Sequence, residues 1–345
     1  MKNKVIIIFM LISLILPQLY AQQSNFISDV SKKGTTAAPF LSIGQSARAI
    51  GMGSAFVGVV NDVSSIYWNP AGLTKTQGIN VSFDHTLWIA DIKYNYLAAS
   101  YNLGGIGTIG FSYTGSDIGE MNVTTITQPE GTGETFSSTQ AAFSLAYAVQ
   151  LTENFSIGFG PKFIYESIWR MSATAFAMDL GVQYVTPFDD AVLAMSISNF
   201  GTSMQLLGNS NLVLHDLDPE NSGNNGDIPA YLETNSWSLP LTFRVGVAYD
   251  PINTEMHKVT VAVDAMHPSD NYESINIGTE YAYNNFVFIR GGYKSLFLDT
   301  SEESFSFGFG VKQLLVGNVA FMIDYAYQDF GRFSDIQKFT LSVSF

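Results

Sequence analysis

The sequence predicts an all-β membrane protein: a 14-stranded antiparallel transmembrane β-barrel preceded by a small N-terminal hatch of helices and turns. Charged residues make up only 13% of the 345 residues, against about 25% in soluble domains, while Phe, Tyr and Trp reach 14%. Runs of about ten residues alternate between apolar and small or polar side chains, which is the length that a tilted strand needs to cross a bilayer. The connections between these runs alternate between short and long.

The first residues predict a targeting signal that is not part of the fold. Lys2 and Lys4 flank the start of an apolar run at residues 5–16, and Ala21 ends a small-residue cleavage site. The run is too short to span a bilayer as a helix. We therefore expect residues 1–21 to be a signal peptide cleaved near Ala21, followed by a polar leader at residues 22–34.

Residues 35–77 are rich in small side chains and show no sustained alternation, which predicts the hatch. Asn69 can cap a short helix whose first residue is Pro70, because proline supplies a helical φ and has no N–H to leave without an acceptor. The expected hatch residues are Arg48, Gly51, Gly53, Asn69, Pro70, Ala71 and Gly72.

From residue 78 to residue 345 the period of the sequence changes to two, which predicts the barrel. The regular runs lie around residues 81–84, 109–113, 143–149, 155–163, 176–184, 241–247, 258–264, 275–283, 305–312, 319–326 and 338–345. Less regular runs at 92–103, 191–200 and 286–294 bring the expected number of strands to fourteen. A secreted soluble β-sandwich is the alternative, but it would carry many more charges on its polar face.

The polar face of the runs combines glycine, alanine and serine with single charges, as expected for a barrel that encloses another part of the chain. The candidate lumenal charges are Asp84, Lys162, Asp179, Arg244, Asp264, Glu280, Lys312 and Asp324, with Lys338 on the last strand. Because an unpaired charge in a narrow lumen is costly, we expect them to pair with one another or with the hatch. The alternative is a polar track for a solute.

The longer connections, around residues 114–137, 201–239, 294–303 and 328–336, follow the odd-numbered strands. Bacterial barrels have short periplasmic turns and longer outer loops. An even number of strands then places the C-terminus on the periplasmic side. Phe345 resembles the terminal aromatic residue that barrel-insertion machinery uses, and it is equally compatible with an ordinary lipid-facing position.

The 201–239 loop contains several residues that could coordinate calcium through oxygen atoms. They are His215, Asp216, Asp218, Glu220, Asp227 and Glu233. Their spacing matches no EF-hand loop, so we expect a solvated acidic outer loop.

The sequence argues against catalysis, a cofactor or a metal. His85, His215, His257 and His267 are scattered and show no metal-ligand spacing, and no nucleophile elbow or phosphate-binding loop occurs. The net charge of −14 makes nucleic acid an unsuitable partner. Without cysteine, the chain has no disulfide framework.

Two motifs carry a resemblance to a known family. Arg48-Ala-Ile-Gly-Met-Gly-Ser-Ala-Phe and Trp68-Asn-Pro-Ala-Gly-Leu resemble the N-terminal signature of the PorV/PorQ outer-membrane proteins, within the FadL-like barrels. Later stretches such as Leu239-Pro-Leu-Thr-Phe-Arg-Val-Gly, Arg290-Gly-Gly-Tyr and Ile323-Asp-Tyr-Ala-Tyr are similar to that family as well. The resemblance implies a fourteen-stranded barrel with an N-terminal hatch in the outer membrane.

The resemblance also implies two alternative functions. The first is a non-enzymatic role in type IX protein secretion, in which the barrel receives client proteins and passes them to a surface-attachment complex. The second is FadL-like passive uptake of hydrophobic small molecules such as long-chain fatty acids. A purely structural barrel is a third possibility. The expected partners are outer-membrane lipid, secretion and attachment proteins with their clients, or a hydrophobic ligand in the lumen.

Overall fold

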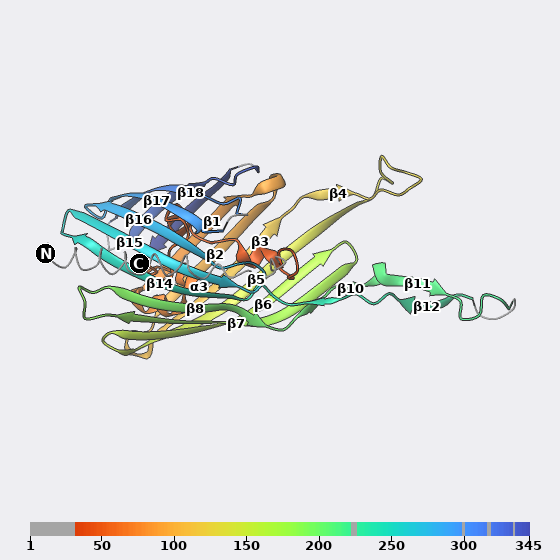
Figure 1. The fold of residues 1–345 in the computed structure, drawn as a ribbon, viewed down its shortest axis with the longest axis horizontal. Helices are drawn as coiled ribbons and strands as arrows, with labels where there is room; N and C mark the ends of the chain where they lie inside the picture. The colour runs from red at the N-terminus through yellow and green to blue at the C-terminus, as the bar shows by residue number, and fades with distance from the viewer. Residues whose placement is uncertain (1–31, 222–225, 299–300, 316–318, 334) are drawn as a thin grey trace, which may run out of the picture. The chain divides into compact units, whose positions relative to one another are not determined.

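The computed structural model of the chain describes residues 32–221, 226–298, 301–315, 319–333 and 335–345. The expected signal peptide and most of the expected leader lie outside the described residues. The described strands form a closed antiparallel barrel, in which the first strand, β1, pairs with the last, β20 (Figure 1). No described helix is long and apolar enough to cross a membrane.

Fourteen described strands make up the barrel wall, so the predicted fold class is confirmed. In the order of their pairing around the barrel they are β1 (Ile79–Leu87), β2 (Lys93–Asn102), β3 (Thr108–Asp117), β5 (Thr135–Thr152), β6 (Phe155–Ile168), β7 (Met171–Val185), β8 (Val192–Gly201), β14 (Thr242–Asn253), β15 (His257–Pro268), β16 (Ser274–Tyr283), β17 (Val287–Leu296), β18 (Phe305–Leu314), β19 (Ala320–Gln328) and β20 (Ile336–Ser344).

The alternation of each strand places apolar side chains outside and small or polar ones inside. In β1, for example, Phe83 is 43% exposed, whereas its neighbours Ser82 and Asp84 are buried. The aromatic and aliphatic residues that the strands expose form the surface that faces lipid in a barrel of this kind.

Three strands are longer than the sequence predicts. β5, β6 and β7 contain 18, 14 and 15 residues and extend beyond their neighbours at the end where the long loops lie. The alternation signal for β5 begins only at Phe143, because the residues before it on the outer face, Ala141 and Thr139, are not large and apolar. Apolar alternation marks only the part of a strand that faces lipid, and it misses the part beyond.

Two long loops contain short strands. The connection after β3 includes β4 (Glu120–Asn122), which pairs with β5. The connection after β8 includes five short strands and one 3₁₀ helix: β9 (Met204–Gln205), β10 (Leu207–Gly208), η5 (Asn209–Asn211), β11 (Leu212–His215), β12 (Ile228–Tyr231) and β13 (Ser236–Trp237). β10 extends the wall beside β7, and β11 pairs with β12 in a separate two-stranded sheet. Two further 3₁₀ helices, η3 (Ile89–Asp91) and η4 (Gly104–Ile106), lie in the connections on either side of β2.

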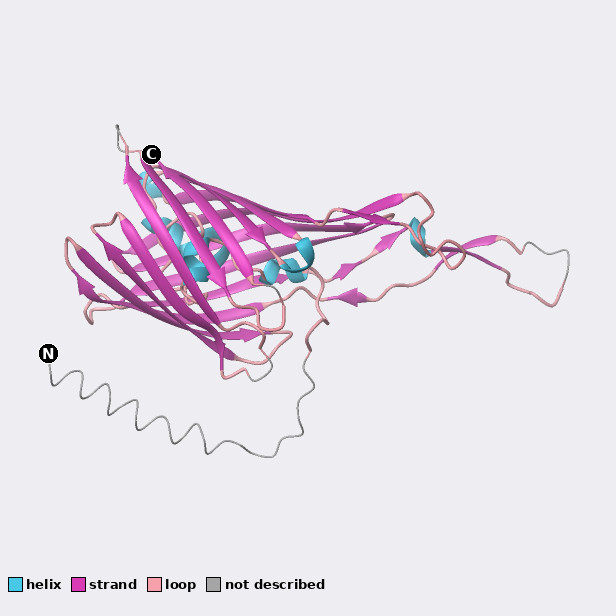
Figure 2. Ribbon diagram, turned by 90° about the horizontal axis from the view of Figure 1, so that it is seen from above, coloured by secondary structure: helices cyan, strands magenta, loops and turns pink. Residues whose placement is uncertain are grey.

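Residues 35–77, here called the N-terminal segment, occupy the inside of the barrel (Figure 2). Their short helices are η1 (Pro39–Ser42), α2 (Ala47–Gly51), α3 (Ser65–Trp68) and η2 (Pro70–Lys75). Asn69 caps η2 as expected, since its Oδ1 accepts a hydrogen bond of 3.1 Å from Ala71 N.

The N-terminal segment crosses the barrel from the end with the long loops, the loop end, to the end with the short turns, the turn end. At the loop end, Ala37 N donates to Ser238 O (2.9 Å) and Thr36 Oγ1 donates to Asp270 Oδ2 (3.1 Å). At the turn end, Asn102 Nδ2 donates to Thr76 O (2.7 Å), and β1 begins immediately afterwards.

This direction predicts which side of the membrane each end of the segment faces. The chain has no cysteine, so single cysteines can be introduced as reporters. With short turns in the periplasm, Lys33→Cys should react with a membrane-impermeant maleimide on intact cells. Gly105→Cys, in the turn after β2 where an added side chain meets nothing, should react only after the outer membrane is permeabilised. The reverse pattern would mean that the barrel has the opposite orientation.

Candidate functional site

Carboxylates on the inner face of the barrel bind backbone N–H groups of the N-terminal segment. Asp84 Oδ2 accepts a hydrogen bond of 2.6 Å from Ser46 N, just before α2. Asp264 Oδ2 accepts hydrogen bonds from Phe56 N (2.6 Å) and Val57 N (2.9 Å). Both carboxylates are fully buried, so these charge-assisted bonds hold the segment where water cannot compete for them.

A chain of ion pairs links α2 to three strands of the wall. Arg48 donates to both oxygens of Glu280 (2.8 and 2.9 Å) and also pairs with Asp62 (2.9 Å). Glu280 in turn accepts from Arg290 Nε (2.6 Å), and Arg290 Nη1 pairs with Asp324 (2.6 Å). Burial lowers the pKa of Arg48, but the nearby carboxylates outweigh burial and raise the pKa above its usual value, so Arg48 is charged.

The spacing between Arg290 and Asp324 depends on an intervening glycine. Arg290 lies on β17 and Asp324 on β19, with β18 between them. On β18, Gly310 leaves open the space between the two side chains: a Cβ there would lie 2.2 Å from Asp324 Oδ1 and 2.9 Å from Arg290 Nη1. The ion pair therefore crosses a strand that contributes no side chain at that point.

A second charged cluster lies within the wall itself. Lys162 Nζ is 2.7 Å from Asp179 Oδ2 and donates to Asn199 Oδ1 (2.8 Å), while Asp179 Oδ1 accepts from Asn199 N (2.8 Å). The register between β7 and β8 shifts at this point, and Asn199 has a positive φ of 63°. The cluster thus provides hydrogen-bond partners for backbone and side-chain groups that, because of the register shift, do not take part in the regular hydrogen bonding between the two strands.

The remaining expected charges have individual surroundings. Arg244 donates to Ser198 Oγ (3.0 Å), and its guanidinium lies 5.5 Å from the ring centre of Trp68 in α3. Lys338 donates to the carbonyl oxygen of Gly44. Lys312 is only partly buried and lines a pocket at the turn end.

Glycines allow direct contact between the backbone of the N-terminal segment and the wall. A Cβ on Gly51 would lie 2.8 Å from Gly308 Cα. Gly53, whose φ of +63° suits glycine, approaches Gly292 so closely that a Cβ on Gly292 would lie 2.2 Å from Gly53 N. The two glycines of the Gly-Met-Gly motif therefore face glycines of β18 and β17.

The Asn-Pro-Ala-Gly motif sits against β6 and β7. Asn69 Nδ2 donates to Val182 O (3.0 Å) and to Val57 O (3.2 Å). Gly158 and Gly181 leave room for the motif, since a Cβ on Gly158 would lie 2.4 Å from the carbonyl carbon of Pro70. Asn69, Ala71 and Gly72 are completely or almost completely buried. The motif is a packing and capping element against the wall.

Near the loop end, the lumen is filled by apolar side chains. Phe40, Leu41 and Ile43 pack in one buried cluster with Ile164 and Leu239. A cavity next to Phe40 and Leu41 has a volume of about 20 Å³, and another next to Ile43 about 10 Å³. Pockets for small molecules are typically about 300–1,000 Å³, so each of these holds at most a water molecule or two.

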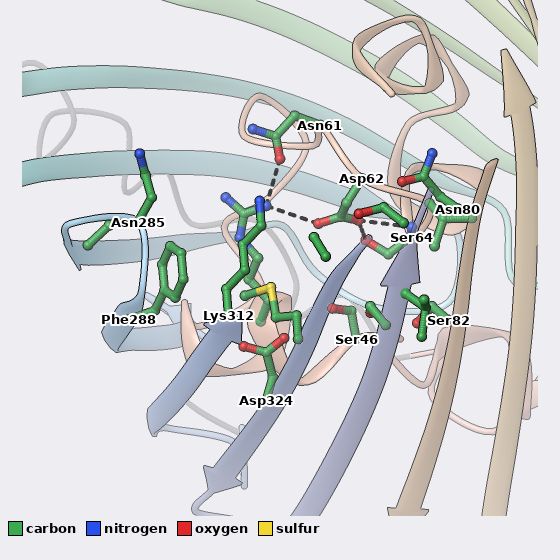
Figure 3. Close-up of a pocket in the computed structure, with 18 of the residues that line it drawn as sticks. Ser46, Asn61, Asp62, Ser64, Asn80, Ser82, Asn285, Phe288, Lys312 and Asp324 are labelled. Atoms are coloured by element: carbon green, nitrogen blue, oxygen red, sulfur yellow. Dashed lines mark hydrogen bonds and ion pairs between the residues drawn. The ribbon is translucent and has the colours of Figure 1, made fainter. Parts of the chain in front are cut away.

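Larger pockets open at the turn end, and they are polar. One of about 290 Å³ is lined by charged groups that include Arg48, Asp62, Glu280, Lys312 and Asp324 (Figure 3). A second pocket of about 290 Å³ shares Arg48, Asn61 and Lys258 with it. A recess of mixed charge is suited to solvent or a polar partner and not to a hydrocarbon.

Three of the four histidines lie in separate pairs at the barrel ends or on the wall. In each pair the histidine Nδ1 lies 2.8 Å from an oxygen atom. His85 is paired with Asn95 Oδ1, His257 with Tyr281 OH, and His267 with Glu273 Oε1. Among the described residues, which include most of the acidic 201–239 loop, no group of three or more His, Asp or Glu side chains is placed to hold a metal ion.

The sequence did not identify several residues that hold the N-terminal segment. Arg290 was missed because its strand alternates irregularly, although it lies directly opposite Glu280 in the register. Ser306 and Thr340, whose hydroxyls accept from Gly53 N (3.0 Å) and Ala47 N (2.7 Å), look like ordinary small lumenal residues. No local signal in the sequence separates them from their neighbours.

Comparison with known proteins confirms the resemblance that the two motifs carry. Residues 27–185 match the family model of the type IX secretion system protein PorV. No curated protein matches the chain.

Solved structures that share the fold include toluene transporters and a monoaromatic hydrocarbon channel. The toluene transporter TbuX of Ralstonia pickettii has a TM-score of 0.53 and 14% identity, covering 87% of this chain and 97% of that one. The toluene transporter TodX of Pseudomonas putida has a TM-score of 0.55 at 14% identity, with the same coverage. The CymD monoaromatic hydrocarbon channel has a TM-score of 0.52 at 14% identity, with 87% and 96% covered. These likenesses concern the barrel fold alone.

Proposed function

We propose that this chain, a PorV-like outer-membrane β-barrel, serves type IX protein secretion without catalysing a reaction, by receiving client proteins and passing them to surface attachment. The observation that carries the proposal is the match of residues 27–185 to the PorV family model. The matched region contains the whole N-terminal segment and the first strands of the wall. Secretion and attachment proteins are its partners, in addition to the lipid around the barrel.

The contacts between the N-terminal segment and the wall support a role at the surface of the barrel. Hydrogen bonds through side chains join the N-terminal segment to β1, β15, β16, β18 and β20. The segment also lies against glycines of the wall, among them Gly158, Gly292 and Gly308. In this proposal the segment is a fixed hatch at residues 35–77, and the lumenal carboxylates Asp84, Asp264 and Glu280 are its anchors. Clients are then handled at the loop end and do not pass through the lumen.

A deletion strain tests the proposed function. Clients that bear a C-terminal signal domain should accumulate inside the cell and be missing from the surface, and the full-length gene should restore them. Unchanged secretion and attachment of these clients would refute the proposal. Sequencing the N-terminus of the purified protein tests the remaining processing step, cleavage near Ala21.

A second candidate function is passive uptake of a hydrophobic small molecule, which the names of the structural neighbours suggest for those proteins. The cavities of about 20 and 10 Å³ near the loop end do not favour it. A deletion strain that grows normally on limiting fatty acid or hydrocarbon would count against it.

A disulfide between the N-terminal segment and the wall distinguishes the two functions. A Cβ on Gly58 would lie 3.1 Å from Ala248 Cβ, so a small outward shift would bring the two into the range of roughly 3.5–4.5 Å that disulfides show. The Gly58→Cys/Ala248→Cys variant should therefore cross-link, with client secretion unchanged because the hatch stays in place. An uptake route that needs the hatch to move would be blocked until the disulfide is reduced. The two single variants are the controls, and a reversible loss of client secretion would show that the segment moves in function.

A further inference from the structure

The two-stranded sheet β11–β12 in the connection after β8 has an exposed apolar face. Leu212 lies opposite Tyr231, and Leu214 lies opposite Pro229. Leu212, Leu214 and Tyr231 are 44%, 65% and 67% exposed. In Figure 1 both strands lie beyond the loop end, away from the wall strands. A contiguous apolar face on a strand pair that projects into solvent is typical of an interaction site.

One edge of this sheet is open to a further strand. Among the described residues, β11 pairs only with β12. Pro229 has no N–H, which makes β12 the poorer edge, whereas all residues of β11 can donate and accept. An isolated two-stranded hairpin is marginally stable, so a third strand added along β11 would stabilise it while contributing its own side chains to the face.

The charge of the connection defines which partner fits. Residues 202–241 contain no lysine or arginine and five carboxylates: Asp216, Asp218, Glu220, Asp227 and Glu233. An anionic lipid surface would repel this segment, and a basic protein surface would be attracted to it. The apolar face supplies contact area, and the carboxylates favour partners of the opposite sign.

We propose that the β11–β12 sheet is the docking surface for client proteins, and that a client binds it with a basic surface that adds a strand along β11. This inference rests on the proposed function, and it identifies the part of the molecule that binds the clients. It requires no metal ion, since the carboxylates attract the partner directly.

The test uses the full-length protein in lipid nanodiscs and the purified C-terminal signal domain of a secreted client as probe. The apolar variant is Leu212→Ser/Leu214→Ser/Tyr231→Ser, and the charge variant is Asp216→Asn/Asp218→Asn/Glu220→Gln/Asp227→Asn. The control is Ile126→Ser, which removes a fully exposed apolar side chain from the other long loop. The Kd should rise at least tenfold for both hairpin variants and by less than twofold for the control. The charge variant should also lose most of the salt dependence of binding.

Each other outcome contradicts a different statement. If the wild-type protein binds and both hairpin variants bind equally well, this docking surface is wrong and the proposed function stands. If the wild-type protein does not bind the client domain, the proposed function fails and the docking surface with it. If binding requires added calcium and is abolished by EDTA, the carboxylates form a cation site and direct recognition of a basic surface is excluded.

Discussion

Replacing Glu280 with glutamine is expected to lower the stability of the barrel by about 3–5 kcal/mol, the cost of removing one partner from a buried ion pair. Glu280 is 5% exposed and accepts hydrogen bonds from both Arg48 and Arg290. The amide would leave the buried guanidinium of Arg290 and the partly buried one of Arg48 facing a neutral side chain that also presents donors. Thermal unfolding in detergent, followed by circular dichroism or by the heat-modifiable shift on a gel, measures the loss.

Glu302→Gln is the matched control for this prediction. Glu302 also pairs with an arginine, Arg332, but in the solvent-exposed loops. Because such pairs are screened by water, the control variant should unfold at the same temperature as the wild-type protein. Equal melting of the Glu280 and Glu302 variants would mean that the buried network does not hold the N-terminal segment.

Replacing Gly292 with valine is expected to displace the N-terminal segment and open the lumen. A Cβ there would lie 2.2 Å from Gly53 N and 2.3 Å from the Met52 carbonyl carbon, and a backbone cannot give way as a flexible side chain can. The strand itself should still form, since valine suits β-structure. We expect trypsin to cut the exposed segment at Arg48 and the single-channel conductance in planar bilayers to rise well above that of the wild type.

Gly291→Val is the control on the same strand. The adjacent residue points the other way, and a Cβ on Gly291 meets nothing within 4 Å. Its conductance and trypsin resistance should match those of the wild-type protein. If the two valine variants behave alike, contact between Gly292 and the Gly-Met-Gly motif is not what keeps the lumen closed.

The sequence predicted the inward position of most lumenal charges but not their partners. Arg244 and Asp264, on neighbouring strands and opposite in sign, were expected to be able to pair. In the register, however, Asp264 lies opposite Gly246 and Arg244 lies opposite Met266, so the two are offset along the strands. Asp264 binds the N-terminal segment instead, and Arg244 stacks over Trp68.

The expected fourteen strands and the turn-and-loop asymmetry follow from local features of the chain. Alternation with a period of two is a property of consecutive residues, so it can be recognised without knowing which strands pair with each other. The same holds for the cap at Asn69, which uses a donor only two residues away. The sequence by itself therefore determined the barrel, its inner and outer faces and the compact nature of residues 35–77.

Only the tertiary structure decided how the barrel is filled. Arg48 meets Glu280 across 232 residues of sequence, and Gly51 meets Gly308 across an even longer separation. Such contacts depend on strand register and on the direction in which the N-terminal segment crosses the lumen. They also depend on glycines whose missing side chains leave room for the segment. Because these are properties of the closed barrel and not of any neighbouring residues, the contacts between the N-terminal segment and the wall became visible only in three dimensions.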